Sequence, residues 1–176
     1  DVGETSLDEP DLPAALAYLR GAGVGIEPDG FATKLVIPNS EILYRTIPAP
    51  GPGTADRRRQ IAEALEGQTP YAVADLVFDW SGTGPEVQVA VVARETLREA
   101  EAFARANRFN PLSFVAMPPE GAFAGEPWFG PAEGAKALLP EGDRVERDQD
   151  PIRIVPRDPA PKSPAAAARA RARDEP

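Results

Sequence analysis

The sequence predicts a mixed α/β fold, in which strands and amphipathic helices alternate over residues 34–117. Two observations carry this prediction. Val87–Ala93 is a short run that is apolar on both faces, which is typical of a strand near the centre of a covered sheet. The next segment, Arg94–Asn107, repeats apolar residues at the spacing of an amphipathic helix. The expected order of elements is strand, strand, helix, strand, strand, helix, strand.

The N-terminal part predicts a helix and a strand pair. We expect a helix over Pro10–Gly23, because its leucines recur at helical spacing. These leucines are Leu12, Leu16 and Leu19. Lys34–Ile37 and Glu41–Ile47 have the composition of strands, and Pro38–Ser40 separates them. We therefore expect these two strands to form a hairpin.

The second expected helix contains the first candidate binding site. Thr54 is expected to cap a helix that ends near Glu66. Arg57, Arg58 and Arg59 follow in its first turns, where the positive end of the helix dipole disfavours each cation by about 0.3 kcal/mol or more. Such a triplet indicates either a partner-binding site or solvated arginines on an acidic protein, and both interpretations stay open.

The third expected strand leads into a glycine-rich turn. Tyr71–Trp80 alternates in polarity, and Ser81–Pro85 turns the chain. Asp79–Gly84 superficially resembles a phosphate loop, but we interpret it as a hairpin turn, because it joins two antiparallel strands and no helix follows. Asp75 and Asp79 lie about 13 Å apart along an extended strand, too far to share a proton, and are interpreted as solvated positions.

The last third of the chain is rich in proline and glycine. Asn107 is expected to take the left-handed conformation at the helix end, and Leu112–Met117 is expected to form another strand. Glu120–Pro131 is predicted to be a loop, followed by a short helix that begins at Pro131. Ile152–Val155 is a candidate edge strand.

Three aromatic residues of the predicted loop form the second candidate binding site. They are Phe123, Trp128 and Phe129. Burial of such side chains contributes a few kcal/mol, so they can pin the loop over the sheet. The alternative is that they form an exposed anchor for a protein partner.

Composition excludes several classes of function. The 176 residues include neither cysteine nor histidine, which excludes disulfides, thiolate zinc sites and histidine-dependent catalysis. The net charge is −9, and residues 157–176 hold five basic and three acidic residues, so the rest of the chain is still more acidic. This charge argues against nucleic-acid binding by the folded part. The acidic run at 141–150 lacks the spacing of a calcium loop, so we predict no metal, no cofactor and no catalytic residues.

We expect four parts along the chain. Residues 1–30 form an N-terminal helix and connector, and residues 31–117 form the α/β core module. Residues 118–156 form the Gly/Pro-rich loop, the short helix and the candidate edge strand packed on the core. Residues 157–176 are rich in proline, alanine and arginine and are expected to be a disordered linker. No apolar run approaches the roughly 20 residues of a transmembrane helix.

The core module resembles part of the actin-like cytoplasmic proteins of bacterial envelope machines, namely the type IV pilus M protein and the type II secretion L protein. The resemblance is carried by Leu35–Asn39, Leu43–Pro48, Ala64–Glu66, Thr69–Tyr71, Leu76–Trp80 and Val87–Ala93. It implies that a small mixed sheet forms part of an actin-like (ribonuclease H-like) fold. Actin-like proteins bind ATP with two glycine-containing loops, and no such loop precedes Lys34.

The resemblance therefore implies a platform rather than an enzyme. We expect a non-enzymatic adaptor that contacts a protein partner in the cytoplasm, with the inner face of the cytoplasmic membrane as its place in an envelope assembly. A partner strand can add to a sheet edge, or the partner docks at one of the two candidate sites. The tail is interpreted as a tether toward a membrane anchor downstream. The alternatives are a nucleotide-binding actin-like ATPase fragment, and a tail that contacts nucleic acid or anionic membrane.

Overall fold

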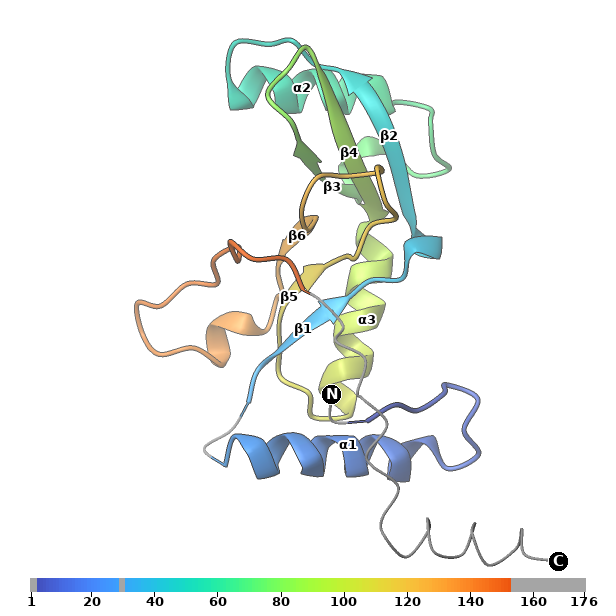
Figure 1. Ribbon diagram of the computed structural model, residues 1–176, viewed down its shortest axis with the longest axis vertical. Coiled ribbons are helices and arrows are strands. Elements are labelled where there is room, and N and C mark those ends of the chain that lie inside the picture. Colours follow the sequence, from blue (N-terminus) through green and yellow to red (C-terminus); the bar gives the residue numbers. More distant parts are fainter. Residues whose placement is uncertain (1–2, 29–30, 153–176) are drawn as a thin grey trace, which may run out of the picture.

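The computed structural model describes residues 3–28 and 31–152, and it confirms the mixed α/β fold (Figure 1). Two three-stranded sheets are present among these residues, with strand orders β1-β5-β6 and β2-β4-β3. The strands are β1 (Thr33–Val36), β2 (Ile42–Pro48), β3 (Leu76–Ser81), β4 (Glu86–Ala93), β5 (Pro111–Val115) and β6 (Trp128–Pro131). The α-helices are α1 (Leu12–Ile26), α2 (Thr54–Leu65) and α3 (Arg94–Ala106). Short 3-10 turns are η1 (Asn39–Glu41), η2 (Val73–Asp75) and η3 (Ala135–Ala137).

The central strand β4 confirms the prediction from its sequence. It pairs antiparallel with both β2 and β3. Val89 and Val91 face one core with α2, whereas Ala90 and Val92 face the other core with α3 and the second sheet. All four side chains are buried. A strand covered on both faces has no need of polar alternation, which explains its continuous apolar run.

The two cores lie on opposite faces of this sheet. α2 buries Ile61 and Leu65 against β2, β3 and β4. On the other face, Leu97 of α3 packs with Phe114 of β5 in the larger core. Each side chain of this size stabilises the fold by about 1.5–3 kcal/mol when fully buried.

The expected hairpin of the first two strands is wrong. β1 pairs in parallel with β5, and β2 pairs antiparallel with β4, so the two strands belong to different sheets. The 3-10 turn η1 carries the chain from one sheet to the other. Its Asn39 accepts a hydrogen bond from the Tyr44 hydroxyl (2.7 Å) and donates one to the carbonyl of Met117 (2.8 Å). These bonds fix the crossing between the sheets.

Two expected helix caps are also wrong. Gly53 is the N-cap of α2, and Thr54 lies inside the helix. Asn107 has φ −96°, and the left-handed position falls on Arg108 instead, with φ 60°. The Asn107 amide donates to the carbonyl of Phe103 (2.9 Å), which caps the last turn and delays the reversal by one residue.

The C-terminal part differs most from expectation. The predicted loop contains β6, which pairs antiparallel with β5, and Pro131 ends this strand instead of beginning a helix. The expected short helix is reduced to η3. Of the candidate edge strand, only Ile152 is described, and it lies outside any strand; residues 153–155 and the tail lie outside the described residues. The division into four parts stays a prediction.

None of the described helices combines the length and the apolarity that crossing a bilayer requires.

Candidate protein-interaction surface

The three consecutive arginines have separate roles within the chain. Arg57 donates from its two terminal nitrogens to the carbonyls of Thr83 (2.9 Å) and Gly84 (2.8 Å), and so clamps the β3–β4 turn. Because this turn is the Ser-Gly-Thr-Gly segment, its interpretation as a hairpin turn is confirmed.

The other two arginines contact different neighbours. The Arg58 guanidinium lies over the half-buried rings of Phe78 (5.2 Å) and Trp80 (5.1 Å). Arg59 forms ion pairs with two acidic residues of its own helix, Asp56 at 3.1 Å and Glu63 at 3.5 Å. The structure therefore distributes the triplet over three sets of contacts and does not bring it together as one site.

Two of the three loop aromatics, Phe123 and Phe129, pack as the first interpretation expects. Phe123 and Phe129 are buried in the larger core, where they pin the loop and β6 over the sheet. Neither ring is available as an exposed anchor. Trp128 is half-buried, and its indole N–H is buried with no hydrogen-bond partner among the residues that the structure describes.

Asp79 is not the solvated position that the sequence indicated. Its carboxylate accepts a hydrogen bond from the backbone N–H of Trp128 (2.9 Å) and pairs with Arg147 at 3.0 Å. Burial raises the pKa of Asp79, while the Trp128 hydrogen bond and the Arg147 charge oppose that rise. This carboxylate thus ties β3 to β6 and joins the two sheets. Asp75 is exposed, as expected.

A second polar cluster fastens the last described segment. The buried carboxylate of Glu126 lies 3.0 Å from the Lys34 ammonium and accepts a hydrogen bond from the Ile152 N–H (2.7 Å). Asp148 also pairs with Lys34. Burial acts to lower the pKa of Lys34, but the bonds to Asp148 and Glu126 outweigh it and raise this pKa. Since every group here has a partner within the chain, the cluster is structural.

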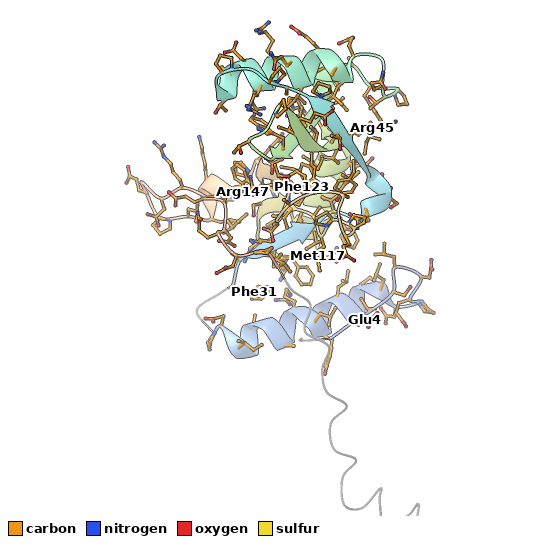
Figure 2. The ribbon with its side chains drawn as sticks, turned by 45° about the horizontal axis from the view of Figure 1, so that its top comes forward. Glu4, Phe31, Arg45, Met117, Phe123 and Arg147 are labelled. Atoms are coloured by element: carbon orange, nitrogen blue, oxygen red, sulfur yellow. The ribbon has the colours of Figure 1, made fainter. Side chains whose placement is uncertain are left out.

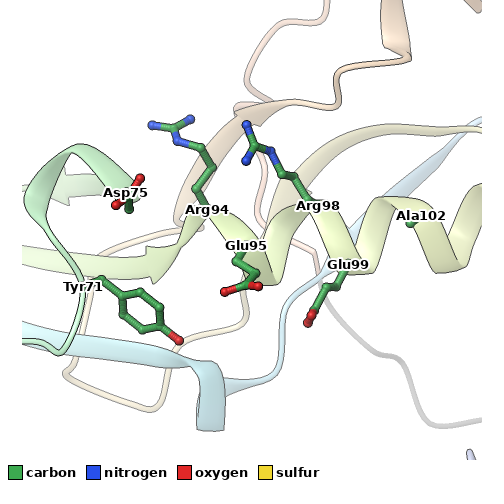
Figure 3. A pocket seen from close by; sticks show the side chains of 7 residues that line it. All are labelled: Tyr71, Asp75, Arg94, Glu95, Arg98, Glu99 and Ala102. Atoms are coloured by element: carbon green, nitrogen blue, oxygen red, sulfur yellow. The ribbon is translucent and has the colours of Figure 1, made fainter.

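An open depression of about 500 Å³ lies where α3 begins (Figure 3). It is lined by Tyr71, Asp75, Arg94, Glu95, Arg98, Glu99 and Ala102. Arg94 and Arg98 point to one side of the helix, and Glu95 and Glu99 point to the other (Figure 3). Its charges are of both signs and exposed. Among the described residues, no group of acidic residues is arranged to hold a metal ion.

The exposed apolar surface of α1 is the strongest candidate for a protein-interaction surface. This helix of 15 residues has Arg20 as its single charge, and Leu16 is the one residue of it that the described chain buries. Three large side chains are exposed: Tyr18 by 75%, Ile26 by 65% and Val24 by 40%. We call these three residues, which at about 3.6 residues per turn lie on different sides of the helix, the α1 surface. A helix that is apolar all round is normally buried all round, and this one is not.

The place of α1 in the fold is set by aromatic contacts. Phe31 packs edge-to-face on Phe109, just after α3, with ring centroids 6.4 Å apart. At Gly23 of α1, a side-chain carbon would lie 3.0 Å from the Phe31 ring, so glycine permits the close approach. α1 therefore crosses the end of α3 and keeps most of its surface outside the core (Figure 1). The sequence analysis missed this surface, although one charge in 15 residues is a signal for it.

Comparison with solved structures gives a remote similarity. No protein-family model matches the chain, and no curated protein matches it. Among solved structures, the chain is similar to the cytoplasmic domain of EpsL, an inner membrane component of the type II secretion system of Vibrio cholerae. The TM-score is 0.46 and the identity 18%, over 61% of this chain and 46% of that one. The chain thus spans about half of that domain.

Proposed function

We propose that this chain is a non-enzymatic adaptor domain that binds a protein partner through the α1 surface, at the cytoplasmic side of a bacterial envelope assembly. One observation carries the proposal: α1 carries a single charged residue, yet the described chain buries only one residue of it. The placement at an envelope assembly rests on the sequence resemblance of Leu35–Asn39 and Leu43–Pro48 to the actin-like platform proteins.

The energy available at the α1 surface fits a reversible contact. Because Tyr18, Val24 and Ile26 are already partly buried, covering the rest of each would contribute at most about 1.5–3 kcal/mol. Loss of translational and rotational freedom, together with side-chain ordering, offsets several kcal/mol of this gain. A partner that covers the α1 surface alone is therefore expected to bind with about millimolar affinity. Additional contacts at a neighbouring element would tighten it.

The proposal is tested by site-specific photo-crosslinking. A benzophenone amino acid replaces Tyr18 in one variant and Arg45 in a control variant, in cells that produce the protein. Arg45 is exposed on β2 and lies at the opposite end of the molecule from α1 (Figure 2). We expect a protein adduct from position 18 that is absent from position 45. Adding Ile26→Glu should reduce the adduct, because a charge then enters the contact.

Two results would contradict the adaptor function. Equal adducts from positions 18 and 45 would show that contact is unspecific. Saturable binding of Mg-ATP in calorimetry, together with turnover, would favour the nucleotide-binding actin-like alternative over a platform. That alternative stays a prediction.

A further inference from the structure

We infer that the outer edge of β1 accepts a β-strand from a second polypeptide, which extends the sheet β1-β5-β6 beneath α1. This inference rests on the proposed function, because it specifies the kind of partner that meets the protein beside the α1 surface. It predicts an extended strand with apolar residues at alternate positions and basic residues at its ends.

Along the outer edge of β1, peptide groups in a regular row have no backbone partner among residues 3–28 and 31–152. The N–H of Thr33 donates to the carbonyl of Asn110 (3.1 Å), and the N–H of Ile37 donates to the carbonyl of Val115 (2.8 Å). Because successive peptide groups alternate in direction, those of Lys34 and Val36 point away from β5. No described strand pairs with this side of β1. Val36 is also 44% exposed, although it lies in a parallel pair, which proteins normally cover on both faces.

α1 lies beyond this same edge. In both Figure 1 and Figure 2, β1 lies between the rest of its sheet and α1, so the free edge faces the helix. The leucine stripe of α1 is incompletely covered: Leu16 is buried, but Leu12 and Leu19 are half-exposed. A strand added about 4.8 Å from β1 would place apolar side chains beneath this stripe. One added strand would therefore pair with the peptide groups at the edge of β1 and also cover the half-exposed leucines of α1.

The occupant must come from outside the described residues. All six described strands already belong to one of the two sheets. A helix cannot use the edge, because the peptide groups of a helix are paired within it, whereas an extended strand offers N–H and C=O groups in register. The outer edge of β2 is blunted at one end by Pro48, which has no N–H to offer.

Charge distinguishes a second polypeptide from a second copy. Acidic residues flank α1 on both sides. They are Glu4, Asp8, Glu9 and Asp11 before the helix and Glu27 after it. Two copies of a chain of net charge −9 would bring these carboxylates together. A strand with lysine or arginine at its ends complements them, and this complementarity increases the rate of association most at low salt.

Amide hydrogen exchange measured by NMR tests the inference on the full chain. The probe is a short synthetic peptide in which valine and threonine alternate between two pairs of lysines. We expect the peptide to slow exchange at Lys34 and Val36 by about tenfold, because their N–H groups gain partners. Leu35 should be unaffected, because its N–H already faces β5. The same peptide with glutamates in place of lysines should protect these amides less.

Two matched proline variants locate the contact. Val36→Pro removes an N–H that β5 does not use, so the sheet is kept and the peptide effect should be lost. Thr46→Pro makes the same change at the outer edge of β2, since the bond from the Ala49 N–H to the carbonyl of Pro85 points the Thr46 N–H outward. This control should retain the effect at Lys34 and Val36.

Three outcomes would overturn the inference. Slow exchange at Lys34 and Val36 in dilute protein without peptide would mean that the chain's own residues cover the edge. Protection that increases with protein concentration would mean that a second copy covers it. Absence of protection up to the solubility limit of the peptide would exclude strand addition. In that last case, a crosslink from position 18 would still support the adaptor function through another geometry.

Discussion

Removing the carboxylate of Glu101 is expected to destabilise the protein by about 2–4 kcal/mol. This side chain lies on the buried face of α3 and is only 5% exposed. Its two oxygens accept backbone hydrogen bonds from the segment after β6, one from Glu133 (2.9 Å) and one from Gly134 (2.8 Å). Arg105 lies 3.8 Å away, one helical turn further along. Glu101 thus fastens α3 to the chain before η3.

The magnitude follows from the two backbone donors. Glu101→Ala leaves both N–H groups without an acceptor, and each buried unpaired donor costs about 1–3 kcal/mol. Alanine has a better helix propensity than glutamate, which reduces the loss of stability by a few tenths of a kcal/mol. Water that enters the vacated space recovers more, so the expected loss lies toward the lower half of the summed range. Glu101→Gln keeps one acceptor and should lose about half as much.

The assay is urea-induced unfolding followed by circular dichroism, with Glu99→Ala as the control. Glu99 lies on the same helix but is exposed, so its substitution should change the free energy of unfolding by less than about 0.5 kcal/mol. Faster amide exchange at Gly134 in the Glu101→Ala variant would show where the loss arises. If the two alanine variants were equally stable, the clamp assigned to Glu101 would be wrong.

Three further predictions concern the contacts of the candidate sites. Arg57→Ala should lower the free energy of unfolding by about 1 kcal/mol, because the β3–β4 turn loses two hydrogen bonds. Arg59→Ala, the control, should lower it by less than about 0.5 kcal/mol. Equal losses in chemical denaturation would contradict the clamp assigned to Arg57. Phe129→Ala should cost about 3–5 kcal/mol in the same assay, and a surface-like loss below about 1 kcal/mol would refute the burial of its ring. Burial raises the folded-state pKa of Asp79, so its contribution to stability is complete below the ordinary Asp pKa and is lost as pH rises through the folded-state pKa. The stability of the wild type relative to Asp79→Asn should therefore decrease from acidic to neutral pH. A difference in free energy of unfolding that does not change with pH would contradict the raised pKa of Asp79.

The sequence predicted elements better than their partners. The apolar pattern of β4 is sufficient to place it at the centre of a sheet, because burial on both faces leaves a direct trace in composition. The pattern of β1 identifies a strand but contains nothing that selects β5 rather than β2 as its neighbour. That choice depends on η1 and on the hydrogen bonds of Asn39, which are tertiary contacts.

β6 was not predicted as a strand because of its local sequence. β6 is four residues long and includes Gly130 and Pro131, two residues that usually indicate a turn, so pairing with β5 overrides local preference.

The sequence did not determine the contacts of the candidate site residues either. An arginine triplet or a loop phenylalanine has the same sequence whether it packs inside or faces solvent. The contacts of Arg57 and the burial of Phe129 emerge only when residues distant in sequence meet.

The parallel pairing of β1 with β5 sets an order of folding. Thr33 and Phe109, which a hydrogen bond joins, are 76 residues apart, whereas β3 and β4 are neighbours in sequence. Closing so long a loop costs less entropy once the residues between have condensed. The unit from β2 to α3 is therefore expected to fold first, and β1 to dock on β5 late. By the same reasoning, β1 is expected to open before the rest of the protein does, so the strand that presents a free edge is also the one held by the least local structure.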